Sequence, residues 1–266
     1  YSYRVWSGAA SSEVLTFSTA VLPEQSFRFS VWSDSQSNPD IYHRVAMGML
    51  AARTDFAVGC GDLVSHGNDY EQWEDRLFGP GAELFARIPF WTAIGNHEGN
   101  AHWFYDFFSF PPPENYYSFD YGNSHFIVLD ANHDEPELIE PQMAWLVRDL
   151  ESPRAKQATW KFAFFHQPPY SEGWDSIGYD GEEEVRRYVV PILEQYGIAV
   201  VFSGHTHDYE RGFLNGVTYI ITGGGGGALD HWYLDWPHIT VARSFFHFCT
   251  VDVEGDRLLL QARHPD

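Results

Sequence analysis

Short apolar runs alternate with amphipathic segments over most of the chain. The short runs are typical of buried strands, and apolar residues at helical spacing indicate the helices between them. We expect strands near residues 27–33, 55–60, 89–94, 124–130, 159–165 and 198–203, and helices near 40–53, 69–78, 141–151 and 182–196. Pro191 predicts a break or kink in the last helix. The alternation predicts an α/β domain in which helices cover sheets.

The two ends of the chain follow another pattern. Residues 1–20 alternate as a β-hairpin, and residues 21–26 read as a linker to a domain over residues 27–266. After residue 207 helical spacing disappears, and hairpin turns are expected at Asn215-Gly216 and near Gly255. Because a lone hairpin is marginally stable in water, the first hairpin either packs on the domain or is the remnant of a longer N-terminal domain.

Charge narrows the range of partners. The chain has 37 acidic against 16 basic residues, a formal charge of −21, and no basic cluster. A nucleic-acid polymer is therefore not expected, because phosphate backbones require clustered cations. No apolar run approaches the roughly 18 residues of a membrane span, and no signal peptide is evident. The protein is either cytosolic or has lost a leader, and its oligomeric state is not indicated.

The cysteines Cys60 and Cys249 lie in apolar, strand-like runs. Free cysteine packs as a small apolar side chain, so two buried thiols are expected. A disulfide is the alternative.

Residues that bind metals follow five of the predicted strands. They are Asp34 and Gln36 after the first strand, Asp62 after the second, Asn96, His97 and Glu98 after the third, His166 after the fifth, and His205 and His207 after the sixth. In open α/β sheets the ligand crevice lies at the carboxyl ends of the strands, so all five groups are expected to face one crevice.

The number of donors favours two metal ions. Asp34, Gln36, Asp62, Asn96, His166, His205 and His207 are more ligands than one ion takes while leaving room for substrate. Two ions that share a carboxylate would use them, and imidazole with carboxylate suits Zn, Fe, Mn, Co or Ni. Gly204 predicts a turn that lets His205 and His207 reach different ions.

Four motifs resemble those of the calcineurin-like metallophosphoesterases: "GDLV", "GNHE", the histidine of "FFHQPPY", and "GHTHDYER". The last motif and "EQYGIAVVFSG" look most like the purple acid phosphatase branch. The resemblance covers roughly residues 27–260 and implies a four-layer α-β-β-α sandwich of two mixed sheets. It also implies that residues 1–20 are the end of a fibronectin-like domain, and that the protein is secreted or periplasmic.

The resemblance further implies residue roles and two divalent or trivalent metal ions, drawn from Zn, Fe, Mn and Co. Asp34 and His207 would bind the first ion, Asp62 would bridge both, and Asn96, His166 and His205 would bind the second. His97 would protonate the leaving group or, with Asn96, hold the phosphoryl oxygens.

Two positions depart from the related families. Purple acid phosphatases have an iron-binding tyrosine three residues after the bridging aspartate, where this chain has Ser65, so we expect a colourless protein. Many other members have a histidine where this chain has Gln36. Gln36 either ligates the first metal, directly or through water, or is a loop residue turned away.

The expected function is hydrolysis of phosphate monoesters, small phosphate-ester substrates, through a hydroxide that the metals activate. A phosphodiesterase or nucleotide pyrophosphatase on the same core is the nearest alternative. A non-catalytic metal-binding module is a third, although no core donor is lost.

Two other features have two interpretations each. Gly223–Gly227 either cradles phosphate or lets the chain pass close beneath the metals. The aromatic residues Trp103, Tyr170, Trp174 and Trp232 either line a substrate pocket or belong to ordinary packing.

Overall fold

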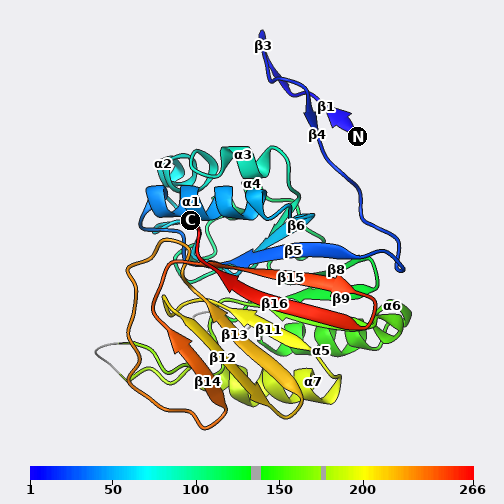
Figure 1. Ribbon diagram of the computed structural model, residues 1–266, viewed down its shortest axis with the longest axis vertical. Coiled ribbons are helices and arrows are strands. Elements are labelled where there is room, and N and C mark those ends of the chain that lie inside the picture. The colour runs from blue at the N-terminus through cyan, green and yellow to red at the C-terminus, as the bar shows by residue number, and fades with distance from the viewer. Residues whose placement is uncertain (133–138, 175–177) are drawn as a thin grey trace.

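Two mixed β-sheets lie face to face between two layers of helices (Figure 1). The computed structural model describes residues 1–132, 139–174 and 178–266. The five-stranded sheet has the order β16-β15-β5-β6-β7 and the seven-stranded sheet the order β14-β12-β13-β11-β10-β9-β8. The strands are β5 (Phe27–Trp32), β6 (Phe56–Gly59), β7 (Phe90–Thr92), β8 (Tyr117–Tyr121), β9 (Ser124–Val128), β10 (Trp160–Phe164), β11 (Val200–Ser203), β12 (Tyr209–Leu214), β13 (Val217–Thr222), β14 (Ile239–Arg243), β15 (Phe248–Glu254) and β16 (Arg257–Arg263). This arrangement confirms the predicted four-layer α/β sandwich.

Parallel pairing joins the strands that lead into the predicted site. β5, β6 and β7 are parallel neighbours in one sheet, and β9, β10, β11 and β13 are parallel neighbours in the other. Antiparallel strands flank both groups. The carboxyl ends of parallel strands in one sheet lie along a single edge, which is where polar loops can converge.

Helices cover the outer face of each sheet through apolar contacts. The five-stranded sheet is covered by α1 (Pro39–Ala51), α2 (Tyr70–Gln72), the π-helical segment η1 (Trp73–Phe78), α3 (Ala82–Phe85) and α4 (His102–Phe107). The seven-stranded sheet is covered by α5 (Ile139–Leu150), α6 (Pro153–Gln157), the π-helical segment η3 (Val185–Val189) and α7 (Val190–Gln195). α1 begins as its sequence predicts, because Asn38 accepts a hydrogen bond from the amide of Ile41 and Pro39 occupies the first turn.

Phenylalanine rings fill the space between the two sheets. Phe29 stacks on Phe56 with ring centroids 5.3 Å apart and meets Phe162 of the opposite sheet edge-on at 5.1 Å. Phe164 stacks on Phe202 at 5.3 Å. All five side chains are fully buried, and each contributes about 1.5–3 kcal/mol by leaving water. This rigid layer fixes the position of the strand ends above it.

The hairpin turns agree with the predictions. Asn215 and Gly216 have φ of 50° and 91° between β12 and β13, the left-handed values of a tight hairpin turn. Gly255 has φ of 61° between β15 and β16. Cys60 and Cys249 are free and buried, which confirms the thiol interpretation.

The N-terminal hairpin projects from the domain (Figure 1). β1 (Ser2–Tyr3) pairs with β4 (Leu15–Thr16), and β2 (Trp6–Ser7) pairs with β3 (Ala10–Ser11) nearer the turn. The Tyr3 hydroxyl donates a hydrogen bond of 2.7 Å to the carbonyl of Ala86. That this hairpin belongs to a longer N-terminal domain stays a prediction.

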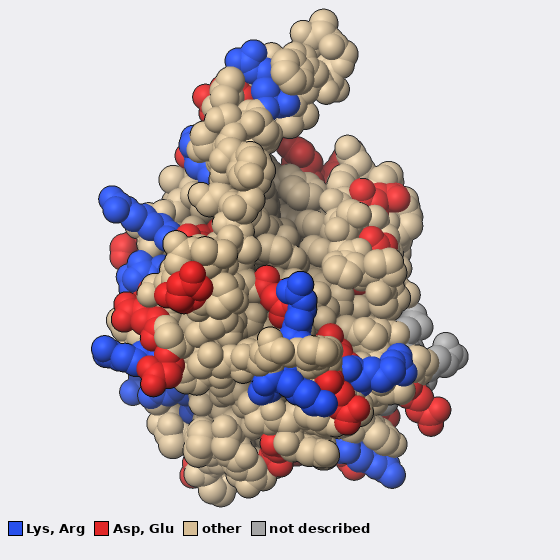
Figure 2. Space-filling model, turned by 90° about the vertical axis from the view of Figure 1, so that its right-hand side faces the viewer, with Lys and Arg blue, Asp and Glu red and all other residues tan. Residues whose placement is uncertain are grey.

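Acidic and basic side chains are intermixed on the face shown in Figure 2, and no basic patch gathers there. In the part of the chain that the structure describes, no helix is long and apolar enough to cross a membrane.

Candidate metal centre

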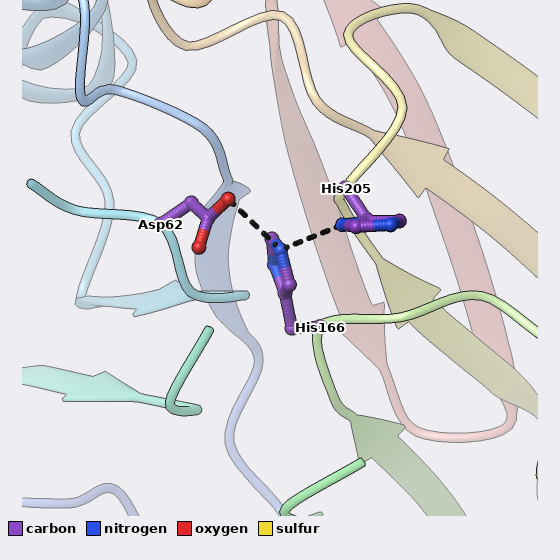
Figure 3. Close-up of side chains that lie close together, drawn as sticks. All are labelled: Asp62, His166 and His205. Atoms are coloured by element: carbon purple, nitrogen blue, oxygen red, sulfur yellow. Dashed lines mark hydrogen bonds and ion pairs between the residues drawn. The ribbon is translucent and has the colours of Figure 1, made fainter. Parts of the chain in front are cut away.

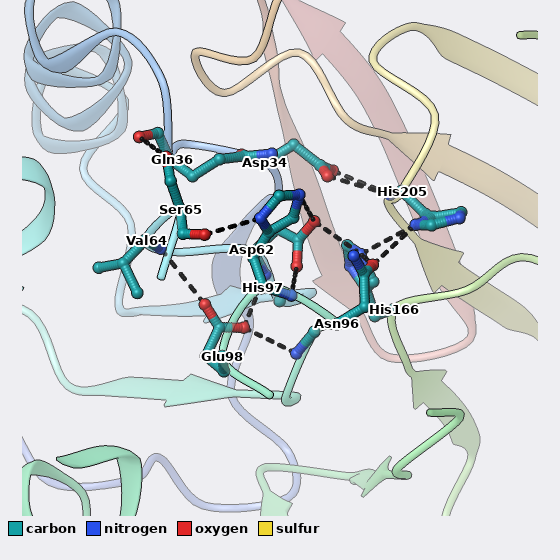
Figure 4. Close-up of polar contacts among 12 residues, drawn as sticks. Asp34, Gln36, Asp62, Val64, Ser65, Asn96, His97, Glu98, His166 and His205 are labelled. Atoms are coloured by element: carbon teal, nitrogen blue, oxygen red, sulfur yellow. Dashed lines mark hydrogen bonds and ion pairs between the residues drawn. The ribbon is translucent and has the colours of Figure 1, made fainter. Parts of the chain in front are cut away.

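The loops after five strands bring the predicted ligands to one edge of the sandwich (Figure 4). Asp34 follows β5, Asp62 follows β6 and Asn96 follows β7 in the five-stranded sheet. His166 follows β10, and His205 and His207 follow β11 in the seven-stranded sheet. Asp34 and His166 are fully buried, and Asp62 is 2% exposed. Buried carboxylates and imidazoles in such a group require a charged partner, and a metal ion is one.

Four of the candidate ligands form a compact group, three of which are drawn in Figure 3 and all four in Figure 4. Nε2 of His166 lies 3.1 Å from Oδ2 of Asp62 and 3.0 Å from Oδ1 of Asn96. Nδ1 of His205 lies 2.9 Å from the same Asn96 oxygen and 3.3 Å from His166 Nε2. The ligand atoms of Asp62, His166 and His205 all lie within 4.8 Å of one another. One cation could contact all of these atoms after small shifts.

The remaining ligands meet on the other side of the centre. Nε2 of His207 lies 3.6 Å from Oδ1 of Asp34 and 3.4 Å from the side-chain amide nitrogen of Gln36. His205 and His207 thus face different groups, as the turn at Gly204 predicts. A methyl group on Gly204 would lie 2.0 Å from Ser33 Oγ, so only glycine lets the two strand ends approach this closely.

Backbone carbonyls orient the histidine rings toward the centre. Nδ1 of His166 donates to the carbonyl of Cys60 at 2.7 Å, and Nδ1 of His207 donates to that of Ala228 at 2.7 Å. A carbonyl only accepts, so each Nδ1 carries the proton and each Nε2 is left to face the acidic ligands. This is the pattern of metal-binding histidines whose orientation is fixed by a second hydrogen bond.

Burial and charge set the protonation of the ligands. Burial raises the pKa of Asp34 to about 6, against the lowering effect of His166 and His207. Burial also opposes charge on Asp62 and His166, but their mutual attraction outweighs it: the pKa of Asp62 is lowered, and that of His166 is raised to about 10. A bound cation takes the place of this proton, because histidine ligates as neutral imidazole.

Left-handed backbone occurs at three ligand residues. The φ values are 61° at Asp34, 51° at Asp62 and 74° at His205. Such values are uncommon outside glycine, although Asp, Asn and His tolerate them best. The amide of His205 donates to both carboxylate oxygens of Asp34, at 3.0 and 3.2 Å. The left-handed turns therefore direct these side chains toward the centre, and the hydrogen bonds from the His205 amide tie the turn at His205 to Asp34.

Glu98 holds the Asp62 loop from beneath (Figure 4). Its buried carboxylate accepts hydrogen bonds from the amides of Asp62 at 2.9 Å, Leu63 at 2.8 Å, Val64 at 3.2 Å and Gly95 at 2.7 Å. Burial, followed by the charge of Asp62, raises its pKa to about 7, although these amides favour its charged form. The sequence places Glu98 at a strand end but does not show this positioning role. Its signal was an acidic residue directly after the "GNH" turn.

His97 lies at the open side of the centre with its ring partly exposed. Nδ1 donates to the carbonyl of Ser65 at 2.9 Å, which leaves Nε2 directed toward Asp62 Oδ2 at 3.8 Å. The Ser65 hydroxyl donates to the carbonyl of Gln36 at 3.0 Å. The two positions that depart from the related families, Ser65 and Gln36, are therefore hydrogen-bonded to each other.

Gln36 is buried, and its side-chain oxygen has no hydrogen-bond partner among the described residues. Its side-chain nitrogen lies 3.4 Å from Nε2 of His207, which can accept a hydrogen bond because the ring proton is on Nδ1. A buried acceptor without a donor, beside Asp34 and His207, is a candidate ligand for a cation.

The chain at Gly223–Gly227 passes close beside Asp34 and His207. The amide of Gly225 donates to the carbonyl of Ser33 at 2.9 Å, and that of Gly227 donates to Asp34 at 2.7 Å. A methyl group on Gly225 would lie 2.2 Å from the Ser33 carbonyl oxygen. Because these amides already donate to backbone carbonyls, they are not free to bind phosphate. The contacts therefore favour the interpretation that the glycines let the chain pass close to the metal centre.

Of the four aromatic residues singled out, Trp174 reaches the centre. Its ring packs on His205 with centroids 4.9 Å apart, and Tyr179, which the sequence did not suggest, packs on the same ring at 5.2 Å. Trp103 packs on Tyr70 and Tyr170 on Trp236, while Trp232 is exposed.

Comparisons with known proteins agree with this geometry. A model of the family described as "Calcineurin-like phosphoesterase" matches residues 28–209. Purple acid phosphatase 23 of Arabidopsis thaliana is 33% identical over 141 residues, covering 48% of this chain and 30% of that protein. A nucleotide pyrophosphatase/phosphodiesterase of Hordeum vulgare is 26% identical over 230 residues, covering 71% and 62%.

A solved structure has a similar fold. The purple acid phosphatase PPD1 from yellow lupin seeds superposes with a TM-score of 0.83 at 19% identity, over 96% of this chain and 55% of that one. The chain spans only 30% to 36% of the length of the purple acid phosphatases first matched.

Proposed function

The chain belongs to the calcineurin-like phosphoesterase family, and from this premise we propose that it hydrolyses phosphate monoesters at a two-metal centre. The observation that supports this most is the convergence of seven donor side chains in two groups joined by buried carboxylates. Similarity to purple acid phosphatases favours a monoester substrate.

The donors fit two cations. Asp34, Gln36 and His207 would hold the first, and Asn96, His166 and His205 the second, with Asp62 between them. The proton positions on His166 and His207 and the unpartnered oxygen of Gln36 support this division. Zn, Fe, Mn and Co all accept such mixed nitrogen and oxygen ligands.

The bound cations would supply an activated water and neutralise charge on the phosphoryl oxygens. The protein's own residues supply orientation and a proton. His97 is held through Nδ1 by Ser65, so Nε2 faces the centre and can donate a proton to the leaving oxygen. Asp62 is fixed by the amide of His97 at 2.9 Å and by Glu98 through its own amide.

Parallel assays with a nitrophenyl phosphate monoester and a bis-nitrophenyl phosphate diester test the substrate class. We expect the monoester to be hydrolysed faster, and Asp62→Asn to lower kcat at least 1,000-fold, about 4 kcal/mol, because the shared carboxylate charge is lost. Elemental analysis should find fewer than two metal ions per chain in this variant. Full activity with both metals retained would refute the proposed centre.

Metal identity and colour test the position of Ser65. Ser65 offers no phenolate, and its hydroxyl is bonded to Gln36, so we expect the metal-loaded protein to be colourless. Elemental analysis of protein purified without added metal, followed by activity after addition of each metal, identifies the ions. A strong visible absorption band in the loaded protein would contradict this expectation.

A phosphodiesterase or nucleotide pyrophosphatase is the second candidate, since a relative of that name matches over 71% of the chain, whereas the purple acid phosphatases first matched cover 48% to 67%. Faster hydrolysis of the diester would favour it. A non-catalytic metal-binding module is the third, and it predicts two bound metals with neither substrate cleaved. Secretion or a periplasmic location remains a proposal that fractionation of the native host would test.

A further inference from the structure

A second group of acidic side chains is buried behind the loop that carries His205 and His207. Asp208 is fully buried and Glu210 is 1% exposed. Among the residues that the structure describes, neither carboxylate forms an ion pair with a lysine or arginine. Two buried carboxylates without a counter-charge are costly, so a proton or a cation must compensate them.

Oxygen atoms of several side chains lie close together beside Gly173. The Ser171 hydroxyl lies within hydrogen-bond distance of Glu210 Oε1 at 3.0 Å, Thr206 Oγ1 at 3.2 Å and the carbonyl oxygen of Gly173 at 3.3 Å. The amide of Glu172 donates to both carboxylate oxygens of Glu210, at 2.9 and 3.0 Å, so one side of this carboxylate is already engaged. A methyl group on Gly173 would lie 3.3 Å from Asp208 Oδ2 and 3.6 Å from Glu210 Oε1. Neighbouring oxygens about 3 Å apart have the spacing of ligands around one cation bound at 2.3–2.6 Å.

Unpartnered polar atoms mark the same region. Both carboxylate oxygens of Asp208 are buried and accept no hydrogen bond of regular geometry, although Glu210 and Thr206 are close neighbours. On another side of Glu210, a small pocket of about 10 Å³ is lined by Ser203 and Tyr219, whose buried hydroxyls have no hydrogen-bond partner among the described residues. A space of this size holds about one water molecule, which could bond these two hydroxyls and the far side of Glu210.

We propose that Asp208 and Glu210, with the hydroxyls of Ser171 and Thr206, bind a divalent cation that prefers oxygen ligands. The site has no imidazole, unlike the centre in front of it, so it selects a hard cation such as Ca²⁺ over Zn²⁺. Two carboxylates balance its charge. The cation would brace the loop from Gly204 to Glu210 from behind, and this role does not depend on the proposed activity.

Calcium binding to the metal-loaded full chain tests this site. Protein freed of calcium is dialysed against CaCl₂, MgCl₂ or NaCl at equal ionic strength, and bound calcium and Tm are measured. We expect one Ca²⁺ per chain and a rise in Tm of about 5 °C at a hundredfold excess over Kd. Mg²⁺ and Na⁺ should raise Tm less.

Variants separate this site from the metal centre. Asp208→Asn and Glu210→Gln should each abolish calcium binding and the rise in Tm. Glu183→Gln, the same charge change at an exposed position, should keep both, and so should Asp62→Asn. No calcium bound to the wild-type chain, or equal binding by Asp208→Asn, would overturn the proposal. If calcium does not change the Tm of the wild-type protein and the Asp208→Asn substitution raises it, the two carboxylates share a proton and the proposal is overturned.

Discussion

At the scale of the residue, the centre depends on side chains that bind no metal. Glu98 joins the amides of two turns through one carboxylate, so the direction of Asp62 follows from a residue on the neighbouring loop. The carbonyls of Cys60, Ser65 and Ala228 each accept a hydrogen bond from Nδ1 of one histidine and so determine that Nε2 faces the centre. Precise placement by such contacts governs both metal affinity and catalysis.

Replacement of Glu98 by glutamine should weaken the centre without changing its ligands. The amide has one acceptor oxygen, and its NH₂ group would face backbone amides, leaving at least one buried donor unpaired at a cost of about 1–3 kcal/mol. We expect a lower Tm and at least tenfold weaker metal binding, measured by thermal unfolding and metal titration. Glu71→Gln, at an exposed position, is the control. Unchanged metal affinity in Glu98→Gln would show that Asp62 is held by other contacts.

That the candidate ligands meet at one edge was predictable from their positions after strands, whereas the contacts that support them were not. Asp34, Asp62 and His166 each follow an apolar run, and parallel strands end on a common edge. The role of Glu98 depends on backbone amides of a different loop, which no local pattern records. Tyr179 and His205 are also far apart in the sequence, and their rings come into contact only in the folded structure.

At the scale of the element, prediction succeeded where apolar patterns were strong. The six expected strands are present, but β8 and β14 were missed because their residues are half-buried and show no clean alternation. The short helices α3, α4 and α6 are too brief to show periodicity. The helix expected near residues 69–78 is present as α2 and η1, but most of it is π-helical, which the sequence pattern did not indicate. The turns before Pro191 are π-helical too, because proline cannot donate the usual helical hydrogen bond.

His125 connects several of these elements at the end of the sandwich away from the centre. Nδ1 lies 2.8 Å from Asp120 of β8, and Nε2 lies 2.8 Å from Asp149 of α5. Arg154 of α6 donates to the other oxygen of Asp120 at 3.1 Å. Burial acts to lower the pKa of His125, but the two carboxylates outweigh it, and the pKa is raised above 6.5.

This raised pKa predicts the pH range in which His125 stabilises the fold. Its contribution is complete below the unfolded value of about 6.5 and is lost as pH rises through the higher folded value. His125→Gln should lower the free energy of unfolding by about 2 kcal/mol at pH 5.5, and by less at pH 9. Thermal unfolding across pH measures this. His102→Gln alters an exposed His–Asp pair of equal length and should change little. A deficit that grows with pH would contradict the assignment.

At the scale of the whole molecule, the two ends of the domain lie side by side in one sheet. The C-terminal strand β15 pairs with β5, so the last hairpin completes the sheet that begins the domain. Which strands pair over such separations was not predictable from local patterns. The strands of the N-terminal hairpin belong to neither large sheet, and its Tyr1, Val5 and Trp6 side chains are exposed.

Removal of residues 1–20 should therefore leave the domain intact. The hairpin buries little apolar surface, and its hydrogen bond to Ala86 is partly exposed. We expect Tm to change by less than about 2 °C, since surface changes of this kind are usually worth no more than about 0.5 kcal/mol. Metal content and activity should also be kept. A large fall in Tm would show that the hairpin is part of the folding unit.

The left-handed turns at Asp34, Asp62 and His205 have an evolutionary consequence. Asparagine tolerates this backbone as well as aspartate does, and one nucleotide change exchanges the two. A descendant can thus lose the carboxylates of the proposed centre while its turns, strands and aromatic core stay in place. Such a chain would be a ready scaffold for recruitment to binding roles. Catalysis in this architecture is easier to lose than shape.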